Sequence, residues 1–358
     1  MWRRILPLVL AVALPACAGP VAQLPDVSVV EIEAERKRQV AFDFDRYMEG
    51  LDRVKSVGFI VLTANADACG NATTSTFGFE AASLEDIKKT WHQAAANKLG
   101  LSSPIGIIQI VKSGPAYRAG LRRGDHIVEL NSTPVPSGRG ATEKFYRMMH
   151  HDRSTTPVSF KIKRGGVTKT VSIRPVRTCA YRVEIATAKS ANAFTDGSRI
   201  VVHQGLLKLA RKDAELALVI GHELAHITAG HLSRKMQNQI AGMVGGLGVD
   251  ALFAVAGLNT GGTFTKAGAK AGTIKYSKEF EKEADYIGMY YLVNSGYPTG
   301  GVETFWRKMS EENPRAIQLA GTHPTTPERY MLIRHTHDEI RLKRRSGKKL
   351  VPNSIPET

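Results

Sequence analysis

The feature that most constrains this chain is a pair of histidines, His222 and His226, with Glu223 beside the first of them. They lie in a run that reads as a helix from about residue 213, and residues four apart share one helical face. Two imidazoles placed in this way can hold one metal ion, and the neighbouring carboxylate can act as a base next to it. The simpler alternative is a helix that carries two histidines by chance. A third ligand elsewhere in the sequence would favour the metal site over this alternative.

A catalytic zinc ion needs a third protein ligand and an open fourth position. In the metzincin arrangement that ligand is a histidine six residues beyond the second one, but this position is Leu232. His231 comes one place earlier, about 100° away around a helix, and does not replace the missing ligand. The sequence therefore excludes the metzincin arrangement.

A carboxylate on a second helix is the better candidate for the third ligand. The run from Tyr276 to Gly288 reads as a helix that Ser277 caps, and its Glu281 and Asp285 lie on one stripe. A buried acidic stripe without a partner is costly, so we expect it to face a cation.

Several segments, in the same order, resemble the zinc metallopeptidase family that contains the CAAX prenyl proteases, the HtpX heat-shock protease and periplasmic proteases of outer-membrane assembly. The resemblance covers about residues 180–335. The matching segments are Ala191-Asn192-Ala193-Phe194, Gly205-Leu206-Leu207, His222-Glu223-Leu224-Ala225-His226, Tyr276-Ser277-Lys278 with the Glu-x-Glu-Ala-Asp-x-x-Gly run that follows it, and Thr322-His323-Pro324 with Arg329.

This resemblance implies a zincin-type fold and one Zn²⁺ ion per chain, held by His222, His226 and Glu281. It also implies that Glu223 is the general base of peptide hydrolysis and that Asp285 orients a ligand histidine. The sequence thus leads to a zinc metallopeptidase of the gluzincin type, in which the third ligand is a glutamate.

The same resemblance implies roles for residues around the substrate. His323 and Arg329 would stabilise the oxyanion or contact substrate, and Asn192 would hold substrate backbone along an edge strand. In some soluble members of the family, the histidine that matches His323 fills the fourth zinc position and keeps the enzyme latent. An active and a latent enzyme therefore both remain open.

A separate module interrupts the chain between about residues 75 and 178. The run Ser113–Asn131, with Ala-Gly-Leu-x-x-Gly-Asp at its centre, resembles the PDZ domains attached to bacterial envelope proteases. Such a domain binds an extended or C-terminal peptide by adding it as a strand. We expect the groove opposite a helix at 143–150, along the strand that contains Ile105, Gly106, Ile107 and Ile108.

The first seventeen residues have the pattern of an export signal. Arg3 and Arg4 precede an apolar stretch too short to span a bilayer, and Leu-Pro-Ala-Cys follows, ending at Cys17. This ending resembles a bacterial lipobox and predicts a periplasmic protein that a lipid on Cys17 anchors to a membrane. Ala18 fits sorting to the outer membrane, and cleavage without lipidation is the alternative.

Two further cysteines, Cys69 and Cys179, flank the inserted module. In an oxidising compartment a lone pair of cysteines favours a disulfide, which would tie the two ends of the insertion together at its neck. Two buried thiols are the alternative.

The formal net charge is +16, and basic residues concentrate at the C-terminal end, in residues 341–349. This run is more typical of a solvated, disordered tail than of a nucleic-acid site, so we expect no nucleic-acid partner. Residues 240–258 are apolar and rich in glycine and alanine. Asp250 in their middle favours a helical hairpin, packed on the protein or touching lipid, over a membrane span.

The sequence therefore predicts an α+β protein with a mainly helical zincin-type metallopeptidase domain, a small antiparallel sheet and an inserted PDZ domain. We expect a zinc endopeptidase that acts on misfolded or unassembled envelope polypeptides. One rival is a latent or inactive, chaperone-like peptide-binding module, and another is an integral-membrane protease that spans the membrane with residues 240–258. The expected segments are a signal peptide (1–17), an N-terminal part (18–74), the PDZ domain (75–178), the peptidase domain (179–340) and a disordered tail (341–358). The N-terminal part is expected to contain a tether, a helix and a strand at residues 58–62.

Overall fold

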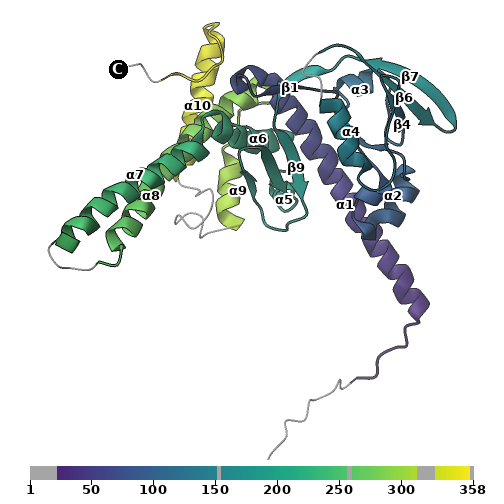
Figure 1. The fold of residues 1–358 in the computed structure, drawn as a ribbon, viewed down its shortest axis with the longest axis horizontal. Helices are drawn as coiled ribbons and strands as arrows, with labels where there is room; N and C mark the ends of the chain where they lie inside the picture. Colours follow the sequence, from purple (N-terminus) through teal and green to yellow (C-terminus); the bar gives the residue numbers. More distant parts are fainter. Residues whose placement is uncertain (1–21, 151–154, 256–259, 313–326, 355–358) are drawn as a thin grey trace, which may run out of the picture. The chain divides into compact units, whose positions relative to one another are not determined.

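The computed structural model describes residues 22–150, 155–255, 260–312 and 327–354, and the fold is α+β as expected (Figure 1). The described residues up to 39 and those from 40 onward belong to two separate units. The helices are α1 Val29–Ala64, α2 His92–Leu99, α3 Pro115–Arg118, α4 Ala141–His150, α5 Leu206–Leu209, α6 Asp213–Thr228, α7 His231–Val255, α8 Thr263–Asn294, α9 Thr304–Glu312 and α10 Pro327–Arg345, with short 3₁₀ turns at Ala66–Cys69, Leu84–Asp86 and Lys89–Trp91.

The strands form three sheets. One contains β2 Phe79–Ala82, β3 Gly106–Ile110, β4 His126–Leu130, β6 Val158–Arg164 and β7 Val167–Ile173 in that spatial order, with β5 Thr133–Pro134 beside β4. The second pairs β1 Thr73–Thr76 with β8 Val176–Cys179, and the third has the order β10 Ala193–Thr195, β11 Arg199–His203, β9 Arg182–Ala186. In this third sheet β10 runs antiparallel to β11, whereas β9 runs parallel to it.

Helix α1 starts with a reciprocal cap. The Ser28 Oγ accepts a hydrogen bond from the Glu31 N–H at 3.2 Å, and the Glu31 carboxylate accepts one from the Ser28 N–H at 2.9 Å. These bonds satisfy backbone donors that the first helical turn otherwise leaves open. The Ser28 hydroxyl and N–H also lower the pKa of Glu31.

The expected strand at residues 58–62 is wrong, because this stretch lies within α1. Val54, Val57 and Val61 are buried at spacings of three and four, so the helical period continues through the β-branched residues. A Cβ on Gly58 would lie 2.9 Å from the Val183 side chain. The glycine therefore lets β9 approach the helix, and this packing outweighs the local strand preference.

The β1–β8 ribbon forms the neck of the inserted module. Thr73 pairs with Cys179 at its base, and a disulfide joins Cys179 to Cys69 with a Cα–Cα distance of 5.6 Å. The two cysteines are 110 residues apart, so this crosslink closes a loop that contains the whole β2–β7 sheet.

The C-terminal segment is packed on the protein, so the expectation of a disordered tail is wrong for residues 341–354; residues 355–358 lie outside the described part. Lys343 in α10 donates to the Tyr290 hydroxyl at 2.7 Å and to the Val351 carbonyl at 2.6 Å. The Asn353 N–H donates to the Tyr286 hydroxyl at 2.9 Å. Leu350 also packs against the peptidase core, which gives the basic segment an apolar attachment to α8.

Helices α7 and α8 pack side by side along their length (Figure 1). Residues 240–255 lie in α7, in keeping with the expected hairpin. Within the described ranges, no helix has both the length and the apolarity that crossing a membrane requires. The residues predicted to form an export signal, Cys17 among them, lie outside these ranges.

Removal of the disulfide is expected to destabilise the protein strongly. In the loop-entropy description, closure of a loop of this size contributes up to about 4–5 kcal/mol to the free energy of unfolding. The Cys69→Ala/Cys179→Ala variant should therefore unfold at a lower urea concentration, measured by circular dichroism. A reductant should lower the midpoint of the wild type and leave that of the variant unchanged; equal midpoints for oxidised wild type and variant would contradict this account.

Candidate metal centre

The centre forms where α6 and α8 touch through two glycines. A Cβ on Gly221 would lie 3.0 Å from the Gly288 carbonyl, and one on Gly288 would lie 3.0 Å from the His222 backbone nitrogen. Any larger residue would push the helices apart. The close approach brings the acidic stripe of α8, Glu281 and Asp285, against the histidines of α6.

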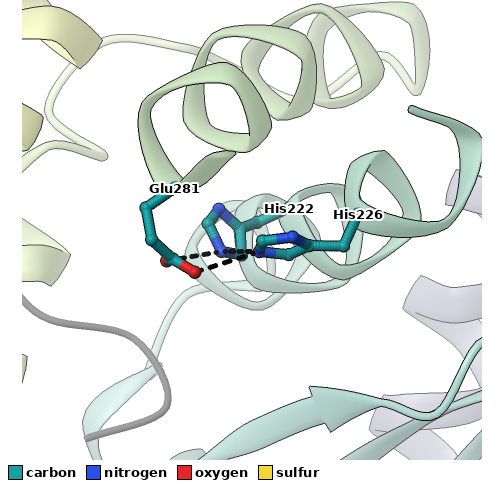
Figure 2. Close-up of side chains that lie close together, drawn as sticks. All are labelled: His222, His226 and Glu281. Carbon is teal, nitrogen blue, oxygen red and sulfur yellow. Dashed lines mark hydrogen bonds and ion pairs between the residues drawn. The ribbon is translucent and has the colours of Figure 1, made fainter. Parts of the chain in front are cut away.

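Three buried side chains converge in this contact (Figure 2). The Nε2 atoms of His222 and His226 are 3.1 Å apart, and each is 3.3 Å from an oxygen of the Glu281 carboxylate. All three side chains are at least nine-tenths buried. The structure thus brings together the three metal ligands that the sequence suggested.

The spacing and the charge of this cluster both fit a divalent zinc ion. Ligand atoms of a tetrahedral zinc site, about 2.0–2.1 Å from the metal, lie about 3.3–3.4 Å from one another. Glu223, Glu281 and Asp285 bring three carboxylates into the buried region, where Arg329 is the buried guanidinium that faces them. Two negative charges remain, and a divalent cation balances them.

Asp285 lies behind His222, on the side away from the other ligands. Its Oδ1 is 2.9 Å from the His222 Nδ1, so it can hold the ring with Nε2 directed at the cluster. Burial alone would raise the pKa of Asp285, but the Arg329 guanidinium and His222 bring that pKa below its ordinary value. Without a metal, burial lowers the pKa of His222, yet Asp285 and Glu281 outweigh it and raise that pKa to about 9.

Arg329 of α10 supports the ligands from behind. Its Nε and Nη2 donate to the two oxygens of Asp285 at 2.5 and 2.7 Å, its Nη1 is 3.1 Å from a Glu281 oxygen, and its plane covers the Trp306 ring. Only 2% of its surface is exposed. In this structure the donors of Arg329 are directed at the two carboxylates, and its expected contact with substrate or the oxyanion stays a prediction.

His231, at the start of α7, supports the second ligand histidine in a similar way. Its Nδ1 is 2.9 Å from the His226 Nδ1, its Nε2 is 3.1 Å from a Glu283 oxygen, and its ring stacks on Phe280. Because the His226 Nε2 faces the cluster as an acceptor, the His226 Nδ1–H donates to His231, which donates in turn to Glu283. Burial, followed by His226, lowers the pKa of His231 to about 4, so it is neutral at neutral pH.

From the sequence, His231 was excluded as a third metal ligand, and its contact with His226 was not predicted. The signal was its place five residues after His226, just past the Gly230 turn that separates α6 from α7. A helix that continued unbroken would have put the ring on another face. The turn folds it back onto His226.

His231→Ala is expected to weaken zinc binding about 10–100-fold, the usual effect of losing a side chain that orients a metal ligand. Zinc affinity is measured by competition with a chromophoric chelator at neutral pH. His335→Ala, which removes an exposed histidine of α10, is the matched control and should leave the affinity unchanged. Equal zinc affinity of His231→Ala and wild type would show that Glu283 and His231 do not position His226.

The other predicted site residues are Glu223, Asn192 and His323. Glu223 is buried in α6, close enough to His226 and Arg329 to affect the pKa of each. Asn192 precedes β10 and is half-buried, and its carbonyl accepts a hydrogen bond from the His203 N–H at 2.9 Å. His323 lies outside the described residues.

Strand β10 offers a free edge beside the metal helix. Among the described strands it pairs only with β11, and both strands pack against α6. Its outer backbone groups are therefore available to an extended polypeptide.

The expected peptide groove of the inserted module is wrong in its strand. Gly106, Ile107 and Ile108 lie in β3, and Ile105 comes directly before it, but β3 pairs with β2 on one side and with β4 on the other. A strand that is paired on both sides cannot receive a peptide. The buried Ile105 and Ile107 belong instead to the core of the module.

The edge strands of this sheet are β2 and β7, and β2 is the one that faces α4. The Ala81 N–H donates to the Tyr146 hydroxyl and the Ser83 N–H to the Thr142 hydroxyl, each at 3.0 Å. A cavity of about 700 Å³ lies along this edge, and residues of β2, of α4 and of the C-terminal half of α1 line it. The sequence signal for this edge strand is Phe77-Gly78-Phe79 at its start. Gly78 has a φ of 76°, and a Cβ there would lie 3.1 Å from the Phe59 ring.

The fold and the site together define a mainly helical domain with a candidate metal centre, into whose N-terminal part a second module with its own sheet is inserted. Residues 171–337 match Peptidase family M48, and residues 78–174 match the PDZ domain family. The chain therefore combines a region that matches Peptidase family M48 with a region that matches the PDZ domain family.

Curated relatives of this chain include bacterial and mitochondrial proteases. It is 32% identical over 161 residues to the beta-barrel assembly-enhancing protease of Escherichia coli K12, a match that covers 42% of this chain and 33% of the relative. The metalloprotease LoiP of the same organism is 28% identical, with 43% and 61% covered, and the mitochondrial metalloendopeptidase OMA1 of Schizosaccharomyces pombe is 26% identical, with 47% and 50% covered. The chain thus spans about a third of the length of the first of these relatives.

Proposed function

We propose that this chain is a zinc-dependent endopeptidase of the bacterial periplasm that cleaves misfolded or unassembled envelope proteins. The observation that carries the proposal is the convergence of His222, His226 and Glu281 on one point, with Glu223 buried beside them. A name among the relatives, beta-barrel assembly-enhancing protease, suggests envelope polypeptides as the class of substrate.

Zinc, when held by these three side chains, acts as a Lewis acid toward the scissile carbonyl and lowers the pKa of water. Glu223 takes a proton from the attacking water and passes it to the nitrogen of the leaving amine. His231 and Asp285 hold the two histidine rings in the tautomers that direct Nε2 inward. Asn192 and the free edge of β10 hold the substrate backbone in an extended form next to α6.

The location rests on the leader and the disulfide. A signal ending at Cys17 supports export and a lipid anchor, by sequence pattern, at the outer membrane. The Cys69–Cys179 disulfide suits an oxidising compartment such as the periplasm.

Glu223→Gln is expected to lower the rate of cleavage of an unfolded protein such as reduced casein by about 10²–10⁴-fold, because the amide cannot accept the proton. Zinc content, measured by atomic absorption, should stay at one ion per chain. A chelator should abolish wild-type cleavage and added zinc should restore it, while Glu49→Gln on the exposed face of α1 should behave as wild type. Cleavage that survives the chelator excludes the zinc enzyme, and tight capture of casein without cleavage favours a chaperone-like binding module.

We further propose that the PDZ domain takes peptides along β2. Tyr146→Phe should then raise the affinity for an apolar C-terminal peptide, because the Tyr146 hydroxyl no longer competes for the Ala81 N–H. One such hydrogen bond contributes about 1 kcal/mol, equivalent to about a fivefold change in affinity. Fluorescence polarisation of labelled peptides measures the change.

The matched control is Tyr117→Phe, which removes a half-exposed hydroxyl of α3 outside the cavity along β2 and should change nothing. The same peptide affinity in Tyr146→Phe and wild type would count against β2 as the binding edge.

A further inference from the structure

Helices α7 and α8 form a long hairpin (Figure 1). The outer part of this hairpin exposes an unusual amount of apolar surface. Val255 is 90% exposed and Leu252 73% exposed, although most apolar side chains of the peptidase domain are buried. The exposed apolar side chains of α7 beyond its first turn are Met236, Ile240, Met243, Val244, Leu247, Val249, Leu252 and Val255.

These side chains lie on one face in the first part of α7 and on several faces toward its end. At about 100° per residue, positions 236, 240, 243, 244 and 247 fall within an arc of about 100° and form one stripe. Positions 249, 252 and 255 point in further directions, so the apolar surface extends around the helix toward its end. A groove on a partner protein covers one side of a helix, whereas a lipid surface can surround a helix end on several sides.

The charges of the hairpin point to the same kind of partner. Between Lys235 and Lys266 the chain has a single charged residue, Asp250. Its carboxylate accepts hydrogen bonds from the Thr260 and Thr265 hydroxyls and from the N–H groups of Phe264 and Thr265, so it is used in starting α8. At the outer end the nearest charged side chain besides Asp250 is Lys266, which is exposed near the start of α8.

We propose that the outer part of this hairpin docks on an anionic lipid surface. Its aliphatic side chains enter the boundary between headgroups and acyl chains, and Lys266 binds lipid phosphate. Asp250 stays at headgroup level, where its hydrogen bonds keep it satisfied. The contact is shallow, in agreement with the finding that no described helix is suited to crossing the membrane.

This contact would also set the distance of the metal centre from the membrane. Helix α7 starts at His231 and α8 carries Glu281, eighteen residues after Thr263. At 1.5 Å per residue, the centre lies about 27 Å from the start of α8. The inference does not rest on the proposed peptidase activity, and its test measures membrane contact alone.

The test uses the full chain with Cys17→Ser, so that Leu252→Cys provides the thiol for an environment-sensitive dye while Cys69 and Cys179 stay paired. Vesicles of phosphatidylcholine with a quarter of phosphatidylglycerol should shift the dye emission to the blue, and vesicles of phosphatidylcholine alone should shift it much less. A dye at Val167→Cys, on exposed β7 of the PDZ sheet, is the matched control and should not respond. The readout is local, so any effect of the N-terminal residues on vesicle binding does not alter it.

Leu247→Glu in the labelled chain should lower the apparent affinity for the anionic vesicles at least tenfold, whereas Val167→Glu should have no effect. Thermal unfolding of each variant shows that it is folded. An unshifted dye at position 252 in the presence of anionic vesicles overturns the proposal. A blue shift that appears without vesicles as the protein concentration rises would assign the surface to a second copy of the chain. A blue shift that appears only with an unfolded polypeptide would assign the surface to substrate. Either result also overturns the proposal.

Discussion

The contact between Gly221 and Gly288 is the constraint on which the rest of the centre depends. Only two residues without side chains allow α6 and α8 to approach until backbone atoms nearly touch. At this distance the imidazoles of one helix meet the carboxylates of the other without intervening side chains. A wider separation would leave His222 and His226 without the third ligand, so the packing of two helices and the chemistry of the site are one feature.

The electrostatics of the centre show why so many charged groups are tolerated in a buried region. Burial of three carboxylates is costly unless each finds a partner. Arg329 faces two of them, and the charge that remains matches a divalent cation. Each ligand histidine is in turn held by a group behind it, Asp285 for His222 and His231 for His226. The side chains are thus preorganised for metal binding, which reduces the reorganisation that binding requires.

The sequence predicted some parts of this protein well and others poorly, for identifiable reasons. The two candidate histidine ligands could be found because His222 and His226 are one turn apart in a single helix, and the inserted domain because its turn residues are close together in the chain. The strand expected at 58–62 was wrong because packing of Gly58 against Val183 outweighed local preference. The peptide groove was placed on β3 because a strand pattern does not reveal which strands lie at the edge of a sheet.

By itself, the sequence determined which side chains can bind the metal and that a second domain interrupts the first. Both follow from short-range patterns, in which the period of one helix or the residues of one turn carry the information. Only the tertiary structure decided the partner behind each histidine, the inward position of Arg329 and the exposed surface of α7. These depend on how whole helices pack, as in the contact between Arg329 and Asp285, which lie on two helices far apart in the chain.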